Sequence, residues 1–114
     1  MIPEITVAEL AEKLKTQDSF IVLDVRELHE LGYAKLTDSR LDVTPLSRLA
    51  REGTKALSAP AQSHDSTIYV MCHHGSRSAQ VTAWLAQQGW KNVFYVRGGI
   101  DEYARTVDPS VGYY

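Results

Sequence analysis

Short apolar runs alternate with helical patterns along this chain. Residues 20–23 form a continuous apolar run rich in β-forming side chains, and residues 67–71 have a similar character; both are typical of strands buried on both faces. Shorter strands are predicted at Ile5 and at residues 40–43 and 93–96. Because strands alternate with helices, the sequence predicts an α/β fold built from parallel βαβ units.

The helices are predicted from apolar spacing and from signals at their ends. Thr6 and Glu9 have the spacing of a capping box, so a helix of about ten residues should follow Thr6. Further helices are predicted over residues 27–31, 46–57, 77–88 and 100–106, with Gly32 and Gly89 ending the first and third of these. The small, polar segment 58–66 is predicted to be a loop.

The size and composition of the chain suit one globular domain. With 114 residues, of which 44% are hydrophobic and 23% charged, we expect a single domain over residues 1–114. Its core should span residues 5–106, followed by an irregular tail over residues 107–114. Tyr113 and Tyr114, at the end of this tail, carry no signal of function in the sequence.

Charge and hydropathy exclude several classes of function. The net charge is -2 and no cluster of Lys and Arg is present, so nucleic acid is not an expected partner. The apolar runs are far shorter than the ~20 residues that cross a bilayer, so no membrane span is expected, and the N-terminus lacks the features of a secretion signal. A single cysteine forms no internal disulfide, and with four histidines it does not supply the usual structural zinc site. We therefore expect a cytoplasmic protein without a metal.

Cys72, which directly follows the predicted strand at residues 67–71, is the candidate for chemistry. It opens a short loop of His73, His74, Gly75, Ser76 and Arg77 that leads into a predicted helix. Backbone N–H groups before a helix lack intrahelical partners, and Gly75 permits the loop to curl around the sulfur. Converging N–H dipoles should favour the thiolate at neutral pH. Arg77 would add a positive charge and a planar fork suited to an oxyanionic substrate.

A purely structural cysteine is the alternative interpretation. A lone cysteine at the end of a buried strand is often only a small hydrophobic side chain. Gly75 and Arg77 at these spacings, with a helix behind them, favour a reactive thiol instead. Asp24 ends a second buried strand, and ligands of parallel sheets lie beyond the carboxyl ends of strands. Cys72 and Asp24 should therefore share one rim of the domain.

The other polar residues near this rim are expected to support the site. Asp24 and Arg26 should form an ion pair or a hydrogen-bonded brace between neighbouring loops. His73 and His74 should shape the rim of the pocket, with an acid–base role for either as the alternative. Ser76 should cap the helix that follows.

Three motifs of the chain together resemble a known family. The run from Cys72 to Arg77 resembles the Cys-x-x-Gly-x-Arg active-site loop of rhodanese-like sulfurtransferases. Asp24-Val25-Arg26 is similar to the Asp-Val-Arg signature of that family, and Gly98-Gly99-Ile100 with Tyr103 is similar to its Gly-Gly segment after the last strand. The resemblance spans about residues 6–105 and implies a stand-alone domain with a five-stranded parallel sheet, flanked by helices on both faces. One segment departs from the pattern: residues 32–36 lack the His and the Gly-Ala pair of the family's His-Ile-x-Gly-Ala-like segment.

The resemblance implies a two-step, ping-pong sulfur transfer through a persulfide on Cys72. The donor would be thiosulfate or a persulfide, and the acceptor would be cyanide or a thiol, including a thiol of a partner protein. The loop residues 73–77 would bind the substrate and the persulfide. No organic cofactor is implied.

A cysteine phosphatase and a binding or regulatory module are the competing classes. Dual-specificity phosphatases of this fold use a Cys-x5-Arg loop, whereas four residues separate Cys72 from Arg77 here. The shorter loop suits one added sulfur atom rather than a tetrahedral phosphate. Inactive rhodanese-like modules have typically lost the cysteine that this chain retains, although a reactive thiol would also suit a redox sensor.

Overall fold

Five parallel strands form one sheet, in the order β1-β5-β4-β2-β3. The structure is a computed structural model that describes residues 2–114, so Met1 of the expected domain lies outside the described residues. The strands are β1 (Glu4–Ile5), β2 (Ile21–Asp24), β3 (Leu41–Val43), β4 (Thr67–Met71) and β5 (Asn92–Val96). The α-helices are α1 (Val7–Leu14), α2 (Leu46–Glu52), α3 (Ser76–Gln87) and α4 (Gly99–Thr106). The predicted α/β fold with a five-stranded parallel sheet is confirmed.

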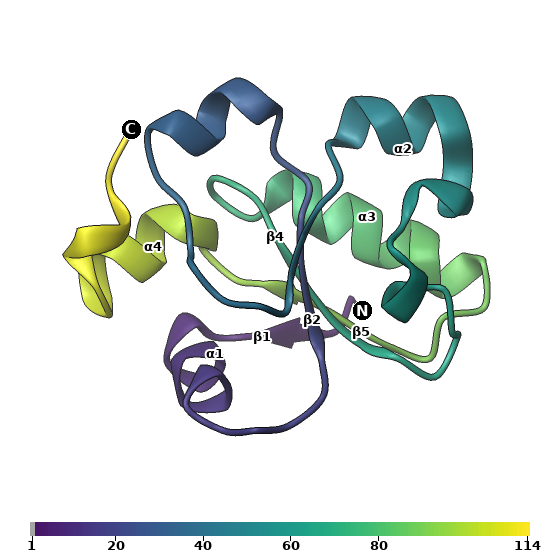
Figure 1. The fold of residues 1–114 in the computed structure, drawn as a ribbon, viewed down its shortest axis with the longest axis horizontal. Coiled ribbons are helices and arrows are strands. Elements are labelled where there is room, and N and C mark those ends of the chain that lie inside the picture. The colour runs from purple at the N-terminus through teal and green to yellow at the C-terminus, as the bar shows by residue number, and fades with distance from the viewer. Residues whose placement is uncertain (1) are drawn as a thin grey trace.

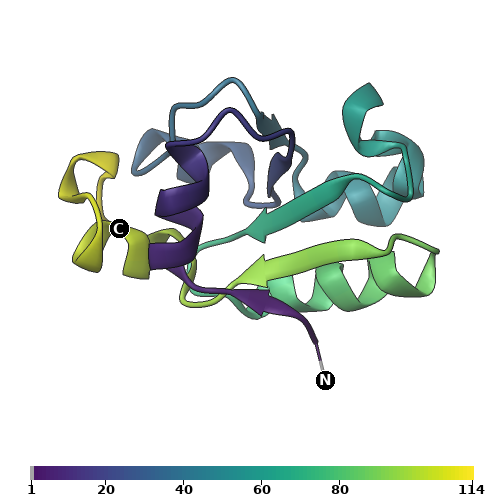
Figure 2. The same cartoon turned by 90° about the horizontal axis from the view of Figure 1, so that it is seen from below.

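Helices cover both faces of the sheet, because the central strands bury side chains on both sides. Leu23 and Val70 point into a core shared with α2 and α3, which lie above the strands in Figure 1. Val22 and Tyr69, their neighbours along β2 and β4, point into a second core shared with α1 and α4. In Figure 2 the strand arrows point toward α4 and the C-terminal tail, so the carboxyl edge of the sheet faces that end of the molecule.

The first helix begins where the sequence predicts. The Oγ1 atom of Thr6 accepts a hydrogen bond from the N–H of Glu9 at 3.1 Å, and the N–H of Thr6 donates to Oε1 of Glu9 at 2.9 Å. The capping box is therefore confirmed, and α1 follows it with eight residues. None of the helices within residues 2–114 has the length and the apolar character that crossing a membrane requires.

The predicted helix over residues 46–57 is wrong in its second half. α2 ends at Glu52, and Gly53 adopts a φ of 72°, which interrupts the regular helix. A 3-10 helix, Gly53–Ala56, continues the chain. The change from one kind of helix to the other is marked in the sequence by this glycine.

Three other segments also contain 3-10 helices. Residues 27–31 were predicted to be helical, and the 3-10 helix observed there, Leu28–Gly32, runs through Gly32 instead of ending before it. The predicted loop over residues 58–66 contains the turn Ala59–Ala61, and the tail predicted to be irregular contains the turn Pro109–Val111.

Thr82 on α3 offers a test of the packing behind the site. Its side chain is fully buried, and its hydroxyl has no hydrogen-bond partner among the described residues. Thr82→Val keeps the shape and removes the unpaired hydroxyl, so it should raise the free energy of unfolding by about 1 kcal/mol in urea denaturation.

The same substitution at Thr44 is the matched control. Thr44 is also buried, but its hydroxyl donates to Oδ1 of Asp42 at 2.8 Å. Thr44→Val should therefore lower the free energy of unfolding by about 1 to 2 kcal/mol. Equal losses in both variants would contradict the assignment of an unpaired hydroxyl to Thr82.

Candidate active site

Cys72 lies in the core, immediately after β4, and its sulfur receives backbone hydrogen bonds. The side chain is only 1% exposed and packs in the apolar cluster between the sheet and α3. The N–H groups of Gly75 and Ser78 point to Sγ at 3.0 and 3.4 Å, and Oγ of Ser78 lies 3.3 Å from Sγ. The predicted convergence of backbone amides on the sulfur is therefore present.

The start of α3 explains why these amides point to the sulfur. Gly75 is the N-cap residue and adopts a φ of 109°, a conformation that side-chain-bearing residues rarely adopt. Ser78 lies in the first helical turn, where N–H groups have no partner within the helix. Ser76 was predicted to be the cap, but the helix begins at Ser76 and no side chain caps it. The hydroxyl of Ser78 instead donates to the carbonyl oxygen of Gly75 at 3.0 Å.

The carbonyl groups of the same loop are bound by the start of α4. The N–H of Ile100 donates to the carbonyl of Cys72 at 2.9 Å, and the N–H of Asp101 donates to that of His73 at 3.0 Å. Gly99 makes this close approach possible, because a Cβ atom there would lie 2.5 Å from the carbonyl oxygen of Cys72. The Gly98-Gly99 pair therefore has a packing reason: it allows α4 to hold the cysteine loop.

Gly99→Ala should damage the cysteine loop. The φ of Gly99 is 62°, and the added methyl group would strike the loop backbone, so the free energy of unfolding should fall by about 2 to 4 kcal/mol. Gly32→Ala is the control, because Gly32 lacks a positive φ and a Cβ atom there would have nothing within 4 Å. Thermal unfolding of both variants tests this, and a loss that is no larger at Gly99 than at Gly32 would contradict it.

Asp24 and Arg26 form the ion pair that the sequence predicts. Both side chains are buried, and Nη2 of Arg26 donates to Oδ2 of Asp24 at 2.7 Å. Arg26 also donates through Nη1 to the carbonyl of Ala34 at 2.8 Å and to the hydroxyl of Tyr114 at 3.2 Å. These extra bonds satisfy a guanidinium that burial would otherwise destabilise. The pair is a brace that joins the end of β2 to the segments that contain Ala34 and Tyr114.

Arg77 is held by Glu30, a residue to which sequence reasoning assigned no role. Nη1 and Nη2 of Arg77 donate to the two carboxylate oxygens of Glu30 at 2.7 and 2.8 Å. Glu30 also accepts from the N–H of Glu27 at 2.9 Å and from the hydroxyl of Tyr114 at 3.0 Å. The hydrogen bonds from Arg77 are the main reason that the pKa of Glu30 falls to about 2. The fork that was expected to face an oxyanion is thus bound to a carboxylate.

The Glu30–Arg77 pair predicts a pH dependence of stability. Because the folded pKa of Glu30, about 2, lies below its ordinary value of 4.5, the pair stabilises the fold fully above about pH 4.5 and is lost as pH falls toward 2. Glu30→Gln should lower the free energy of unfolding by about 2 to 3 kcal/mol at pH 7, and the difference from wild type should shrink in acid.

Glu12→Gln is the control for this titration. Glu12 pairs with Lys15 at 3.6 Å, but both side chains are about three-quarters exposed. Its removal should change stability little at any pH. Urea denaturation between pH 2.5 and 7 measures both variants, and a pH-independent difference for Glu30→Gln would contradict the assignment.

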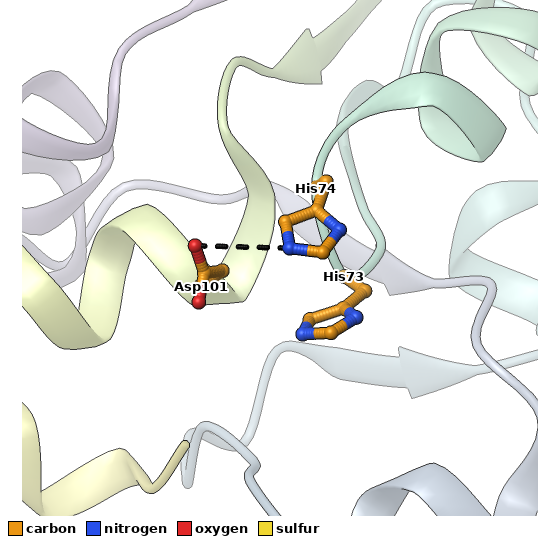
Figure 3. A group of neighbouring side chains, drawn as sticks. All are labelled: His73, His74 and Asp101. Atoms are coloured by element: carbon orange, nitrogen blue, oxygen red, sulfur yellow. Dashed lines mark ion pairs between the residues drawn. The ribbon is translucent and has the colours of Figure 1, made fainter. Parts of the chain in front are cut away.

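The two loop histidines lie between the cysteine loop and α4 (Figure 3). His74 is exposed, and its Nε2 lies 3.8 Å from Oδ2 of Asp101. His73 is partly buried, and Nε2 of His73 lies 2.8 Å from the carbonyl oxygen of Tyr114. Burial lowers the pKa of His73 below its ordinary value, with a smaller contribution from His74. Burial therefore favours the neutral form of His73.

His73, His74 and Asp101 also come close enough to be considered as metal ligands. Two of the three are already engaged, since His73 pairs with the carbonyl of Tyr114 and Asp101 accepts from Arg105 at 3.0 Å. The rings of the histidines are in contact but tilted by 30°, with centroids 3.8 Å apart. These residues therefore form a packed and hydrogen-bonded rim.

One surface hollow lies at the opposite edge of the sheet from this chemistry. It has a volume of about 780 Å³ and is lined by residues at the amino ends of the strands, including Ile21 and Thr67. Cys72 follows the carboxyl end of β4, at the opposite edge of the sheet. The hollow therefore has no part in the candidate site. The candidate site is defined by the geometry around the sulfur.

These features define a class of protein. A parallel α/β sheet presents a thiol at the end of a central strand, inside a short loop whose amides face the sulfur. The sequence model of the family described as rhodanese-like domain matches residues 6–106, which is most of the chain. The chain therefore belongs to the rhodanese-like family.

Similar proteins support this assignment. A rhodanese-related protein from Thermoplasma volcanium has a crystal structure that is 34% identical, with a TM-score of 0.74 over 92% of this chain and 93% of that one. A protein of Allochromatium vinosum named sulfurtransferase is 29% identical, over 97% of this chain and 96% of its own length. The chloroplastic rhodanese-like/PpiC domain-containing protein 12 of Arabidopsis thaliana is 35% identical over 99% of this chain, which spans only 38% of that protein.

Proposed function

We propose that the protein is a sulfurtransferase that carries a sulfane sulfur as a persulfide on Cys72. The observation that carries the proposal is the pair of backbone N–H groups at 3.0 and 3.4 Å from Sγ. Such donors stabilise a negative charge on sulfur, whether on the thiolate or on the persulfide that replaces it. The similarity to a protein named sulfurtransferase along nearly the whole chain adds support.

The first step would load the cysteine. The thiolate of Cys72 attacks the outer sulfur of thiosulfate, a sulfur–sulfur bond forms at Cys72, and sulfite leaves with the electron pair of the broken bond. With a persulfide donor, the leaving group is the donor thiolate. The new outer sulfur lies about 2 Å beyond Sγ, so the group that next reacts is further from the buried end of β4.

The second step would unload it onto an external acceptor. Cyanide or a thiolate attacks the outer sulfur, thiocyanate or a new persulfide leaves, and the thiolate of Cys72 returns. These 114 residues contain no second cysteine to receive the sulfur, so the proposed acceptor is a small molecule or a thiol outside this domain. A cytoplasmic location, where thiols stay reduced, suits this chemistry.

Mass spectrometry after thiosulfate treatment tests the loading step directly. One added sulfur, about 32 Da, should appear on the peptide that contains Cys72 and disappear on treatment with cyanide. Cys72→Ser should show no added sulfur and should lose at least a thousandfold in thiosulfate:cyanide turnover, because its hydroxyl does not form a persulfide.

Hydrolysis of an aryl phosphate is the counter-assay. The loop of four residues between Cys72 and Arg77 suits a sulfur atom better than a phosphate, and Glu30 already occupies the fork of Arg77. We expect no phosphate release. Phosphate release that depends on Cys72, without formation of thiocyanate, would overturn the proposal.

A further inference from the structure

Tyr114 packs into the candidate site from the C-terminal tail, although it lies 42 residues beyond Cys72 in the sequence. Figure 1 shows the C-terminal end beside the segment between β2 and β3 that contains Glu30. We propose that Tyr114 is a positioning residue, which fixes Arg77 and His73 on either side of the cysteine loop. For its activity readout this inference rests on the sulfur-transfer function proposed above.

The hydroxyl of Tyr114 links the two ion pairs of the site. It accepts from Nη1 of Arg26 at 3.2 Å and donates to Oε1 of Glu30 at 3.0 Å. The same oxygen of Glu30 accepts from Nη2 of Arg77 at 2.8 Å. A continuous chain of polar contacts therefore runs from the buried Asp24–Arg26 brace through Tyr114 to the arginine of the loop.

The ring and the backbone of Tyr114 hold the other side of the loop. The ring stacks on His73 with a centroid distance of 3.7 Å and an interplanar angle of 8°. The carbonyl oxygen of Tyr114 lies 2.8 Å from Nε2 of His73, which fixes the direction of the imidazole. The ring of Tyr33 also stacks with the tyrosine ring, with a centroid distance of 5.6 Å. Tyr114 is thus bound through its ring, its hydroxyl and its main chain.

These contacts bear on Cys72 through charge and through loop geometry. The hydrogen bonds of Glu30 chiefly raise the pKa of Arg77, and the charges of Cys72 and Tyr114 add to that effect. Arg77 ends the loop that begins at Cys72, so the placement of its positive charge in that loop depends on the contacts of Glu30 with Arg77 and Tyr114. His73 is the residue next to Cys72, so fixing its ring also restrains the backbone that carries the sulfur.

Two variants separate the hydroxyl from the ring. Tyr114→Phe keeps the stack on His73 but removes the shared partner of Arg26 and Glu30, so the second-order rate of sulfur loading should fall about threefold to tenfold. Tyr114→Ala removes both contacts, and the rate should fall about tenfold to a hundredfold. In both variants the pH profile of the alkylation of Cys72 by iodoacetamide should differ from that of the wild type, and the difference should be larger in Tyr114→Ala.

Tyr113→Phe is the matched control. The hydroxyl of Tyr113 donates to the carbonyl of Ala104 at 2.9 Å, and this side chain is half exposed at the neighbouring position. Its removal should leave the loading rate and the alkylation profile unchanged. Urea denaturation of all variants shows whether each is folded. If Tyr114→Ala does not fold, Tyr114→Phe alone tests the positioning role.

The outcomes distinguish this inference from the proposed function. Folded Tyr114 variants with wild-type alkylation profiles and loading rates would overturn the positioning role and leave sulfur transfer intact. A wild type that never forms a persulfide, together with shifted alkylation profiles in the Tyr114 variants, would overturn the proposed function and support the positioning role. An equal shift in Tyr113→Phe would overturn the specific assignment to Tyr114.

Discussion

The arrangement of the site depends on one turn of backbone, between the end of β4 and the first turn of α3. There the N–H groups of Gly75 and Ser78 point to the sulfur of Cys72, while the carbonyls of Cys72 and His73 point the other way, to α4. Every polar backbone group named here has a partner, so the turn is held from both sides. The same arrangement that satisfies the backbone surrounds the sulfur with positive dipoles. One set of hydrogen bonds therefore both holds this turn in place and directs N–H groups at the sulfur.

The charged side chains around this turn form pairs and not a free cationic cluster. Arg26 is paired with Asp24 inside the protein, and Arg77 is paired with Glu30 at its edge. The guanidinium of Arg26 is fixed by more than its ion pair, because Ala34 and Tyr114 also bind it. Buried charges of this kind cost desolvation energy, and full hydrogen bonding offsets that cost. What the pairs provide is a fixed geometry at the rim of the cysteine loop.

Much of the site could be predicted because its signals are local in the sequence. The order of strand, Cys72, Gly75 and helix implied amides directed at the sulfur, and the need of buried charges for partners implied an ion pair or brace of Asp24 and Arg26. The role of Ser76 was mispredicted, since a glycine with positive φ occupies the cap position and leaves no role for a hydroxyl. α2 ends early for a related reason, at the positive φ of Gly53. The roles of Glu30 and Tyr114 could not be predicted. Glu30 binds Arg77, 47 residues away in the chain, and Tyr114 binds His73, 41 residues away, and no local pattern encodes such contacts.

The pairing of charges has a consequence for how substrates arrive. Asp24 with Arg26, Glu30 with Arg77 and Asp101 with Arg105 each sum to zero, and burial lowers the pKa of His73. A rim of this kind exerts little long-range attraction on an anion. Encounter with a charged donor is then governed by diffusion and shape, and should respond weakly to ionic strength. For the proposed sulfur transfer, selectivity among donors would then arise at contact distance, within the few ångströms around one sulfur atom.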